Sequence, residues 1–512
     1  MPILTNRFIA MNCIPINFNQ LKFFFFSVLI LISFFPHSSK AQYFFGRNKV
    51  NYNQFDWRVM QTEHFDIYFY PEMQELAALG ADYAEEAYKI LQAKFDHAIN
   101  VKIPLIFYSS HFHFQETNVI PNLIPEGVGG FFEFIKGRVV IPANGSLYAF
   151  RHVIHHELVH VFSRSKIKRI LKDNRKLDWT GLPLWFTEGL AEYWSIGWDS
   201  QTEMFIRDAI INNYFFPLQN LYQIRGSFLM YKEGQAFFRF ISERYGENKI
   251  IQLFENYWKI NRFSKVVEAT LGVDFKQLDE EWVYSLKKKY YPILAENDLP
   301  GKVTKEITKN GINTKPAFFR LNSKPYVAFY ANRSGYSNVY QKALEGENPK
   351  DFEAQVLVEG ERTSEFESFH LLGSKLDVSN DGKLAFIAKS GEADAIYIYD
   401  LEAKEILDKL QFDNLIYLSS PAFSPEGDRI VFSAIDFSGK NDLYTTTLSD
   451  KSLNRLTNDF YDDKDPSWDP SNGSIVFSSD RTDYGMQGAY NIFKMDLSTY
   501  LIEHITYGNY QD

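Results

Sequence analysis

Two histidines four positions apart, with a glutamate directly after the first, are the residues of this sequence best suited to chemistry. They are His156, Glu157 and His160, inside the apolar-periodic stretch His152–Phe162. Residues four positions apart lie above one another on one face of a helix. Two imidazoles at that spacing can hold one zinc ion, and the glutamate between them can reach a water at the metal. The five-residue pattern is only moderately specific, so its weight depends on the residues downstream of it.

A second acidic motif lies a few tens of residues downstream. The segment Leu184–Tyr193 places Glu188 and Glu192 one helical turn apart. Catalytic zinc usually has three protein ligands and one position left for water, so the metal needs one more ligand besides the two histidines. A carboxylate on a second helix would complete the set.

Together the two motifs resemble the gluzincin metallopeptidases, whose helix pair carries H-E-x-x-H and then E-G-x-A-E or a close relative. This resemblance implies that His156, His160 and Glu188 bind Zn²⁺ and that Glu157 is the general base. Glu192 could accept the free ring N–H of a ligand histidine and so fix the orientation of its ring.

A plainer interpretation treats the same residues as polar groups on an ordinary helix surface. Against it, two histidines and a glutamate among apolar neighbours would cost several kcal/mol if unpaired, and a metal removes that cost. For His152, near the start of the helix, we favour a solvated side chain over one that lines a cleft. His155 points away from the ligand face and is expected to be structural.

Peptide hydrolysis needs a donor for the oxyanion that forms on the carbonyl. Some gluzincins use a histidine and others a tyrosine, and the rest of this domain has no histidine after His160. The segment Met230–Ile241 reads as the start of a helix and resembles the downstream helix of gluzincin-like peptidases. We therefore predict Tyr231 as the donor, with Tyr193 and Tyr222 as substitutes. A phenol buried only for packing is the alternative.

The segments around these motifs predict an α+β, zincin-like metallopeptidase domain over residues 42–300. Alternation and turn signals predict strands at His64–Tyr70 and Ile103–Tyr108, a helix at Glu72–Phe95 and a hairpin over Phe131–Ile141. By the same resemblance, a sheet edge beside the first zinc helix should pair with an extended substrate. Gly129–Phe134 and Arg138–Ile141 are the two candidates for that edge, and a plain core hairpin is the alternative.

A basic loop is predicted between the two motifs. It could attract an acidic substrate or contact anionic lipid, although a solvated face is the commoner role of such a run. The formal charge of the whole chain is −10, which gives no indication of nucleic-acid binding. The segment contains Arg164, Lys166, Lys168, Arg169, Lys172, Arg175 and Lys176.

The character of the sequence changes near residue 300. Helical periodicity fades, and the strand patterns Ile430–Ala434 and Ile475–Ser479 repeat at a spacing of 45 positions, with related copies at Leu384–Ala388 and Tyr326–Ala331. Such a period is typical of propeller blades, and the S-P-x-G turn before I-V-F-S resembles the TolB-type repeat. Residues 301–512 therefore predict an all-β propeller of about four blades in an incomplete ring, with His504–Asp512 opening another blade. We interpret it as a module for interaction or gating.

Residues 1–41 have the pattern of a signal peptide. The apolar run Phe23–Phe35 has thirteen residues, whereas a membrane span needs about twenty. Small residues at Ser39–Ala41 then favour cleavage before Gln42. An uncleaved anchor is the alternative. Cleavage removes Cys13, the single cysteine, and leaves no transmembrane segment and no disulfide. We expect an exported protein that is periplasmic, outer-membrane-associated or extracellular.

The sequence as a whole predicts an exported zinc metallopeptidase that cleaves peptide or protein substrates and has a propeller for a protein partner. One alternative is a periplasmic, propeller-based binding or scaffold protein with a non-catalytic zinc site, which would have no use for Glu157. The other alternative is a zinc hydrolase that acts on a non-peptide amide or ester.

Overall fold

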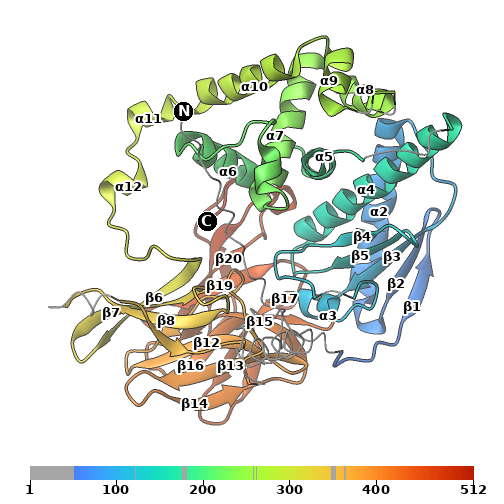
Figure 1. Ribbon diagram of the computed structural model, residues 1–512. Coiled ribbons are helices and arrows are strands. Elements are labelled where there is room, and N and C mark those ends of the chain that lie inside the picture. The colour runs from blue at the N-terminus through green and yellow to red at the C-terminus, as the bar shows by residue number, and fades with distance from the viewer. Residues whose placement is uncertain are drawn as a thin grey trace, which may run out of the picture. The chain divides into compact units, whose positions relative to one another are not determined.

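The computed structural model describes residues 51–512, except residues 122, 176–180, 258, 261, 347–352 and 362–364. The predicted signal peptide at residues 1–41 lies outside the described residues. The described chain forms an α+β domain followed by four small β-sheets (Figure 1). The fold class predicted from the sequence is therefore confirmed. Among the described residues, none of the helices combines the length and the apolar character that crossing a membrane requires.

The α+β domain starts with a five-stranded sheet in the order β1-β2-β3-β5-β4. Strand β2 pairs parallel with β3, and β3 pairs parallel with β5, whereas β4 runs antiparallel to β5. Of the two predicted substrate edges, only the one around β4 is an edge of the sheet. Arg138–Ile141 belongs to β5, between β3 and β4, so that candidate was wrong. The strands are β1 (Arg58–Gln61), β2 (Phe65–Phe69), β3 (Ile103–Tyr108), β4 (Phe131–Glu133) and β5 (Arg138–Pro142).

Two long helices pack next to this sheet, α2 (Gln74–Phe95) and α4 (Leu147–Asp173). Helix α2 presents small residues to its neighbours, and a Cβ at Gly80 would lie 2.6 Å from the ring of Phe107. A bulkier side chain there would push α2 away from the sheet. The short helix α3 (His111–Gln115) follows β3.

The second half of the domain is helical. Helices α5 (Leu184–Ile196) and α7 (Phe228–Tyr245) cross where two glycines meet, and a Cβ at Gly189 would lie 2.4 Å from the backbone of Gly234. Only glycine permits this approach, so Gly189 has a packing role within the second motif. The other helices are α6 (Ser200–Ile211), α8 (Asn248–Tyr257), α9 (Phe263–Leu271), α10 (Phe275–Tyr290), α11 (Ile293–Glu296) and α12 (Pro300–Val303), with the 3₁₀ turns η1 (Pro71–Met73) and η2 (Leu221–Ile224).

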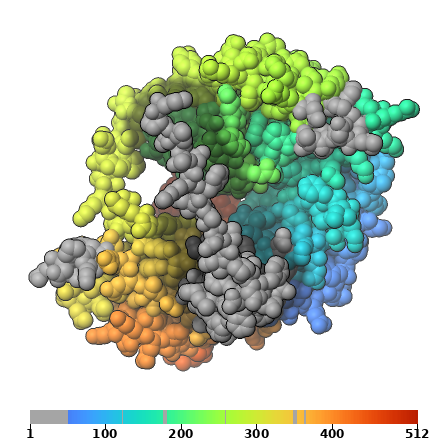
Figure 2. Space-filling view, in the orientation of Figure 1, coloured from blue at the N-terminus to red at the C-terminus, as the bar shows by residue number. Residues whose placement is uncertain are grey.

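The predicted basic loop is mostly helical, so that prediction was wrong: α4 continues to Asp173. In Figure 2 this end of α4 is the teal projection at the upper right. Lys166 is buried rather than solvated: its Nζ donates to the carbonyl oxygen of Phe95 at 2.6 Å and lies 3.3 Å from Glu255 Oε1. Lys176 lies outside the described residues.

The four β-sheets are the predicted blades, and their buried side chains form clusters between successive sheets. The strands are β6 (Asn313–Leu321), β7 (Lys324–Ala331), β8 (Asn338–Ala343) and β9 (Gln355–Val358); β10 (Ser368–Phe369), β11 (Asp377–Val378), β12 (Lys383–Ser390), β13 (Ala393–Asp400) and β14 (Glu405–Leu410); β15 (Leu415–Phe423), β16 (Arg429–Asp436), β17 (Asn441–Thr447) and β18 (Leu453–Arg455); and β19 (Asp463–Trp468), β20 (Ser474–Ser479), β21 (Asn491–Asp496) and β22 (Ile502–His504). Each predicted repeat pattern lies in the strand that is second in the order of its sheet, namely β7, β12, β16 or β20.

The end of the chain belongs to the fourth blade. His504 closes β22, which pairs with β21, and Gln511 forms a bridge with Tyr490. The prediction that His504–Asp512 opens another blade was therefore wrong. The register of β22 shows that its residues complete the sheet begun by β19.

Candidate active site

Helix α4 places the first motif. Ser146 caps the helix, because its Oγ accepts a hydrogen bond from the backbone N–H of Ala149 at 3.2 Å. Ile154, Leu158 and other apolar residues of α4 are buried in the domain core. The opposite face of α4, which carries His156 and His160 four positions apart, then points towards α5.

The three predicted ligands converge. The Nε2 atoms of His156 and His160 lie 3.2 Å apart, and Glu188 Oε2 lies 3.4 Å from the first and 3.2 Å from the second. Ligand atoms at about 2.0–2.1 Å from a tetrahedral zinc ion would be separated by about 3.3 Å. Two imidazole nitrogens and one carboxylate oxygen are also the donors that zinc prefers. The residues present therefore fit a zinc ion, with one coordination position left over.

The electrostatics of this cluster favour a cation. Burial alone would lower the pKa of His156, but the carboxylates of Glu188 and Glu192 raise it to about 10. Burial alone would raise the pKa of Glu188, but the imidazoles of His156 and His160 lower it to about 2. Carboxylate charge held this tightly against ring nitrogens stabilises a positive charge between them.

Glu157 lies beside the ligand cluster and is buried, and this burial raises the pKa of its carboxyl. A Cβ added at Gly130 would lie 3.4 Å from Glu157 Cγ and 3.2 Å from the carbonyl oxygen of Val140. The glycine thus lets the chain that enters β4 pass close to Glu157. The predicted general base therefore lies between the ligand cluster and the sheet edge.

Tyr231 also lies at the cluster. Its ring stacks on that of His156, with centroids 6.4 Å apart and planes 13° apart. Burial, followed by the charges of Glu188 and Glu157, raises the pKa of its phenol. The two substitutes are placed elsewhere: the hydroxyl of Tyr193 donates to Glu247 Oε2 at 3.2 Å, and Tyr222 is 71% exposed in η2. Of the three tyrosines, the structure brings Tyr231 to the ligands.

Glu192 contacts the back of the ligand set. Its Oε1 lies 3.1 Å from Nδ1 of His156, the ring nitrogen that faces away from the cluster. The sequence did not reveal the partner of its other oxygen. That partner is Lys232, whose Nζ donates to Glu192 Oε2 at 2.6 Å. The available signal was a charged residue within the apolar start of α7, next to Tyr231.

The two remaining histidines of the first motif are both largely buried. His155 faces Glu86, with Nε2 and Oε2 4.0 Å apart, which agrees with a structural role. His152 was predicted to be solvated, and this was wrong: its side chain is 20% exposed, and its Nε2 lies 3.7 Å from Glu192 Oε1. Residues at the end of α5 and the start of α6 line the same cavity as His152.

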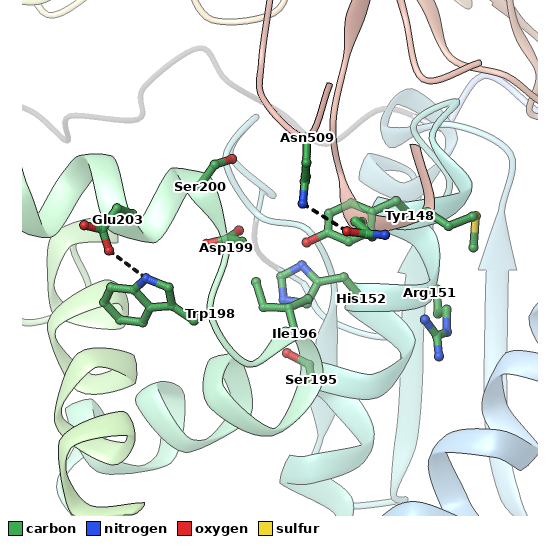
Figure 3. Close-up of a pocket in the computed structure, with 12 residues that line it drawn as sticks. Tyr148, Arg151, His152, Ser195, Ile196, Trp198, Asp199, Ser200, Glu203 and Asn509 are labelled. Atoms are coloured by element: carbon green, nitrogen blue, oxygen red, sulfur yellow. Dashed lines mark hydrogen bonds between the residues drawn. The ribbon is translucent and has the colours of Figure 1, made fainter. Parts of the chain in front are cut away.

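His152 lines a cavity of about 520 Å³ (Figure 3). Side chains of α4, of α6 and of the fourth blade surround it, and the indole N–H of Trp198 donates to Glu203 at 2.8 Å on one wall. The lining residues are Tyr148, Arg151, His152, Ser195, Ile196, Trp198, Asp199, Ser200, Glu203, Met486, Gln487 and Asn509.

Two family models match the chain. Residues 84–288 match the Peptidase MA superfamily, and residues 374–512 match the TolB beta propeller domain. The chain thus carries a Peptidase MA superfamily domain followed by a TolB-like propeller domain, as its motifs predicted. It is a peptidase-like protein with a propeller module.

Several solved structures are similar to parts of the chain. TolB from Acinetobacter baumannii is 18% identical over 40% of this chain and 45% of its own, with a TM-score of 0.32. A putative TolB from Agrobacterium tumefaciens is 18% identical over 35% of this chain and 61% of its own, with a TM-score of 0.28. A puromycin-hydrolyzing peptidase of Mycobacterium tuberculosis is 12% identical over 40% of this chain and 31% of its own, with a TM-score of 0.28. The chain spans less than two thirds of the length of each.

Proposed function

We propose that this protein is an exported, zinc-dependent peptidase whose propeller binds a protein partner or a protein substrate. The observation that carries the proposal is the ligand cluster, with Nε2 of His156 and of His160 and Oε2 of Glu188 separated by 3.2–3.4 Å. The match of residues 84–288 to the Peptidase MA superfamily supports it. The exported location rests on the signal-peptide pattern, and the TolB-like blades agree with it.

Three side chains would hold the metal: His156, His160 and Glu188. When bound, zinc would polarise the scissile carbonyl and make a water at its free position more acidic. Glu192 would keep the proton of His156 on Nδ1, so that Nε2 presents its lone pair to the cluster.

Glu157 would move the proton. Its burial raises its pKa, so the carboxylate becomes a stronger base than an exposed glutamate. It would accept a proton from the attacking water and then deliver it to the nitrogen of the leaving amine.

Tyr231 and β4 would place and stabilise the substrate. The Tyr231 phenol, protonated because its pKa is raised, can donate a hydrogen bond to the carbonyl oxygen as negative charge develops there. The free edge of β4 can pair with an extended peptide, and Gly130 keeps that edge close to Glu157. A peptide bound to this edge would therefore pass the general base.

A Glu157→Gln variant tests the proposal. We expect it to retain zinc and to lose roughly 10²–10⁴-fold in kcat, the usual contribution of a general acid–base group. Cleavage of a peptide library would be followed by mass spectrometry, with and without chelator, and zinc by elemental analysis. Glu233→Gln is the matched control, since it makes the same change at a buried glutamate of α7 that accepts from the Phe216 backbone N–H.

Three outcomes would count against the proposal. Full turnover in Glu157→Gln would show that Glu157 is not the general base. Zinc-loaded protein that cleaves no peptide in the library would favour the scaffold alternative, and cleavage only of non-peptide esters or amides would favour the other hydrolase.

A further inference from the structure

Lys232 is a buried cation inside the peptidase domain, with 1% of its surface exposed. Its Nζ lies 2.6 Å from Glu192 Oε2 and 3.3 Å from Gln235 Oε1, and it is 5.2 Å from the centre of the Phe228 ring. A lysine is almost never fully buried unless it is paired. This ammonium group is therefore held at a defined position.

The surroundings of Lys232 are fixed as well. Gln235 accepts a hydrogen bond from Thr202 Oγ1 at 2.9 Å, and its Nε2 donates to the carbonyl oxygen of Gly197 at 2.9 Å. The contact of Gly189 with Gly234 brings α7 against α5, so the lysine reaches the carboxylate across a short gap. The backbone and side chains around the ion pair thus leave it little freedom.

Glu192 meets Lys232 and His156 with different oxygens, and His152 Nε2 lies 3.7 Å from the oxygen that faces His156. Oε2 binds Lys232, and Oε1 lies 3.1 Å from Nδ1 of His156. The opposite nitrogen of that ring, Nε2, faces Glu188 and His160. An ammonium group, a carboxylate and an imidazole therefore form a continuous chain that ends at the ligand cluster.

We propose that Lys232 is a positioning residue of the metal site. By holding Oε2 of Glu192, it aims Oε1 at His156 and so fixes the ring orientation that presents Nε2 to a divalent cation. The inference rests on the proposed function in one respect, that His156 is a metal ligand. The hydrogen-bond acceptors of Lys232, Glu192 and Gln235, are not among the three predicted metal ligands, so its effect on the metal has to pass through Glu192.

The charges agree with this arrangement. The site contains three carboxylates, those of Glu157, Glu188 and Glu192, and the ammonium group of Lys232 pairs with that of Glu192. In their ionised forms they would leave two negative charges uncompensated, which a divalent cation between His156, His160 and Glu188 would balance. The lysine neutralises the outer carboxylate and leaves the inner cluster for the metal.

The test is a double-mutant cycle on zinc affinity. Zinc dissociation constants of the full chain would be measured by competition with a chromophoric chelator for Lys232→Met, Glu192→Gln and the double variant. We expect Lys232→Met to weaken zinc binding roughly 10–100-fold, the usual range for groups that orient a ligand. In Glu192→Gln, Lys232 should attract the amide oxygen and turn the amide nitrogen towards His156, which disfavours the required tautomer.

The double variant gives the decisive result. Without the ammonium group, the amide that replaces the carboxylate of Glu192 is free to turn its oxygen towards His156. We therefore expect the double variant to bind zinc more tightly than Glu192→Gln alone. A purely structural role for Lys232 would instead make the two losses multiply. The same cycle monitored by the visible spectrum of the Co²⁺-loaded protein reports the ligand geometry independently of activity.

Lys166→Met is the matched control, because Lys166 is another buried lysine of this domain and pairs with Glu255 outside the site. It should lower stability without changing zinc affinity. Wild-type zinc affinity in Lys232→Met, or multiplying losses in the double variant, would overturn the inference. Zinc-binding wild-type protein that cleaves no peptide would instead count against the proposed function alone.

Discussion

Two of the clusters of metal-type ligands lie in different parts of the chain, and they differ in what balances their charge. In each, the ligand atoms lie within 4.8 Å of one another. One cluster joins α4 to α5, and the other lies in the third and fourth blades of the propeller. The first consists of His156, His160 and Glu188, and the second of Asp442, Asp459 and Asp463.

Arginines already neutralise the propeller cluster. Arg481 Nη1 lies 2.9 Å from Asp459 Oδ2, and its Nε donates to Asp463 Oδ1 at 3.0 Å. Arg455 pairs with Asp442. The guanidinium groups already bind all three carboxylates, so this cluster is a partly buried ion-pair network.

The cluster in the peptidase domain is arranged differently. Its carboxylate faces two imidazoles, and the nearby protein cation, Lys232, binds the more distant Glu192. Proximity of acidic groups is thus a poor indicator of a metal site. The more informative observation is two ring nitrogens and a carboxylate oxygen at the spacing of a tetrahedron, beside a cation that pairs with a different carboxylate.

The largest expected difference between the clusters is in zinc content. His160→Gln should lose the metal and the stability that binding adds, about 4 kcal/mol when free zinc is 1,000 times its dissociation constant. Asp442→Asn should retain one equivalent of zinc, because its cluster binds arginine. Elemental analysis and thermal unfolding with and without chelator measure both effects. One equivalent of zinc in His160→Gln would contradict the ligand assignment.

The next effect, on stability and not on zinc content, is expected where the propeller cluster loses its own cation. Arg481→Met should destabilise the fold by about 3–5 kcal/mol, because Asp463 is fully buried and keeps a charge with less compensation. Burial already raises the pKa of Asp463 to about 6 despite Arg481. Denaturant unfolding measures the loss, and zinc content should not change.

Arg244→Met is the control for that variant, since Arg244 forms a largely exposed pair with Glu281. Removing it should cost about 1 kcal/mol or less. If Arg481→Met unfolded at the same denaturant concentration as Arg244→Met, the propeller cluster would not be the tightly balanced network described above.

Local periodicity allowed the metal-ligand motifs and the blade strands to be predicted from the sequence. The spacing of His156 and His160 needs only a helix, and the motif of Glu188 needs only a second helix beside it. The blade strands were predictable because a repeat of 45 positions shows itself without any knowledge of packing. These features depend on residues close together in the sequence or on recurrence.

The features that could not be predicted depend on tertiary packing. Which strand of the hairpin forms the edge is decided by the pairing of β5 with β3, which the hairpin sequence does not contain. Lys232 was missed because its partner Glu192 is 40 positions away, and the two meet only where α5 crosses α7. The burial of Lys166 likewise depends on Phe95 and Glu255, both distant in sequence.

The smallest effect we predict concerns that crossing of α5 and α7, on which the peptidase cluster depends and the propeller cluster does not. In Gly189→Ala, the new Cβ would lie 2.4 Å from the Gly234 backbone, which cannot move aside as a flexible side chain can. Overpacking of this kind costs about 1–3 kcal/mol, and the better helix propensity of alanine, about 1 kcal/mol, offsets part of it. Zinc affinity should also fall, since Glu188 precedes Gly189 in α5 and moves with it.

Gly301→Ala in α12 is the matched control, because a Cβ there would meet no heavy atom within 4 Å. It should leave zinc affinity unchanged and stability equal or slightly higher. Denaturant unfolding and chelator competition on both variants measure the two effects together. If Gly189→Ala unfolded like Gly301→Ala and bound zinc as the natural chain does, the close helix crossing could not be what sets the position of Glu188. The ligand geometry would then have to depend on α4 and the sheet alone. The peptidase cluster would then not depend on the crossing of α5 and α7, and in this respect it would not differ from the propeller cluster.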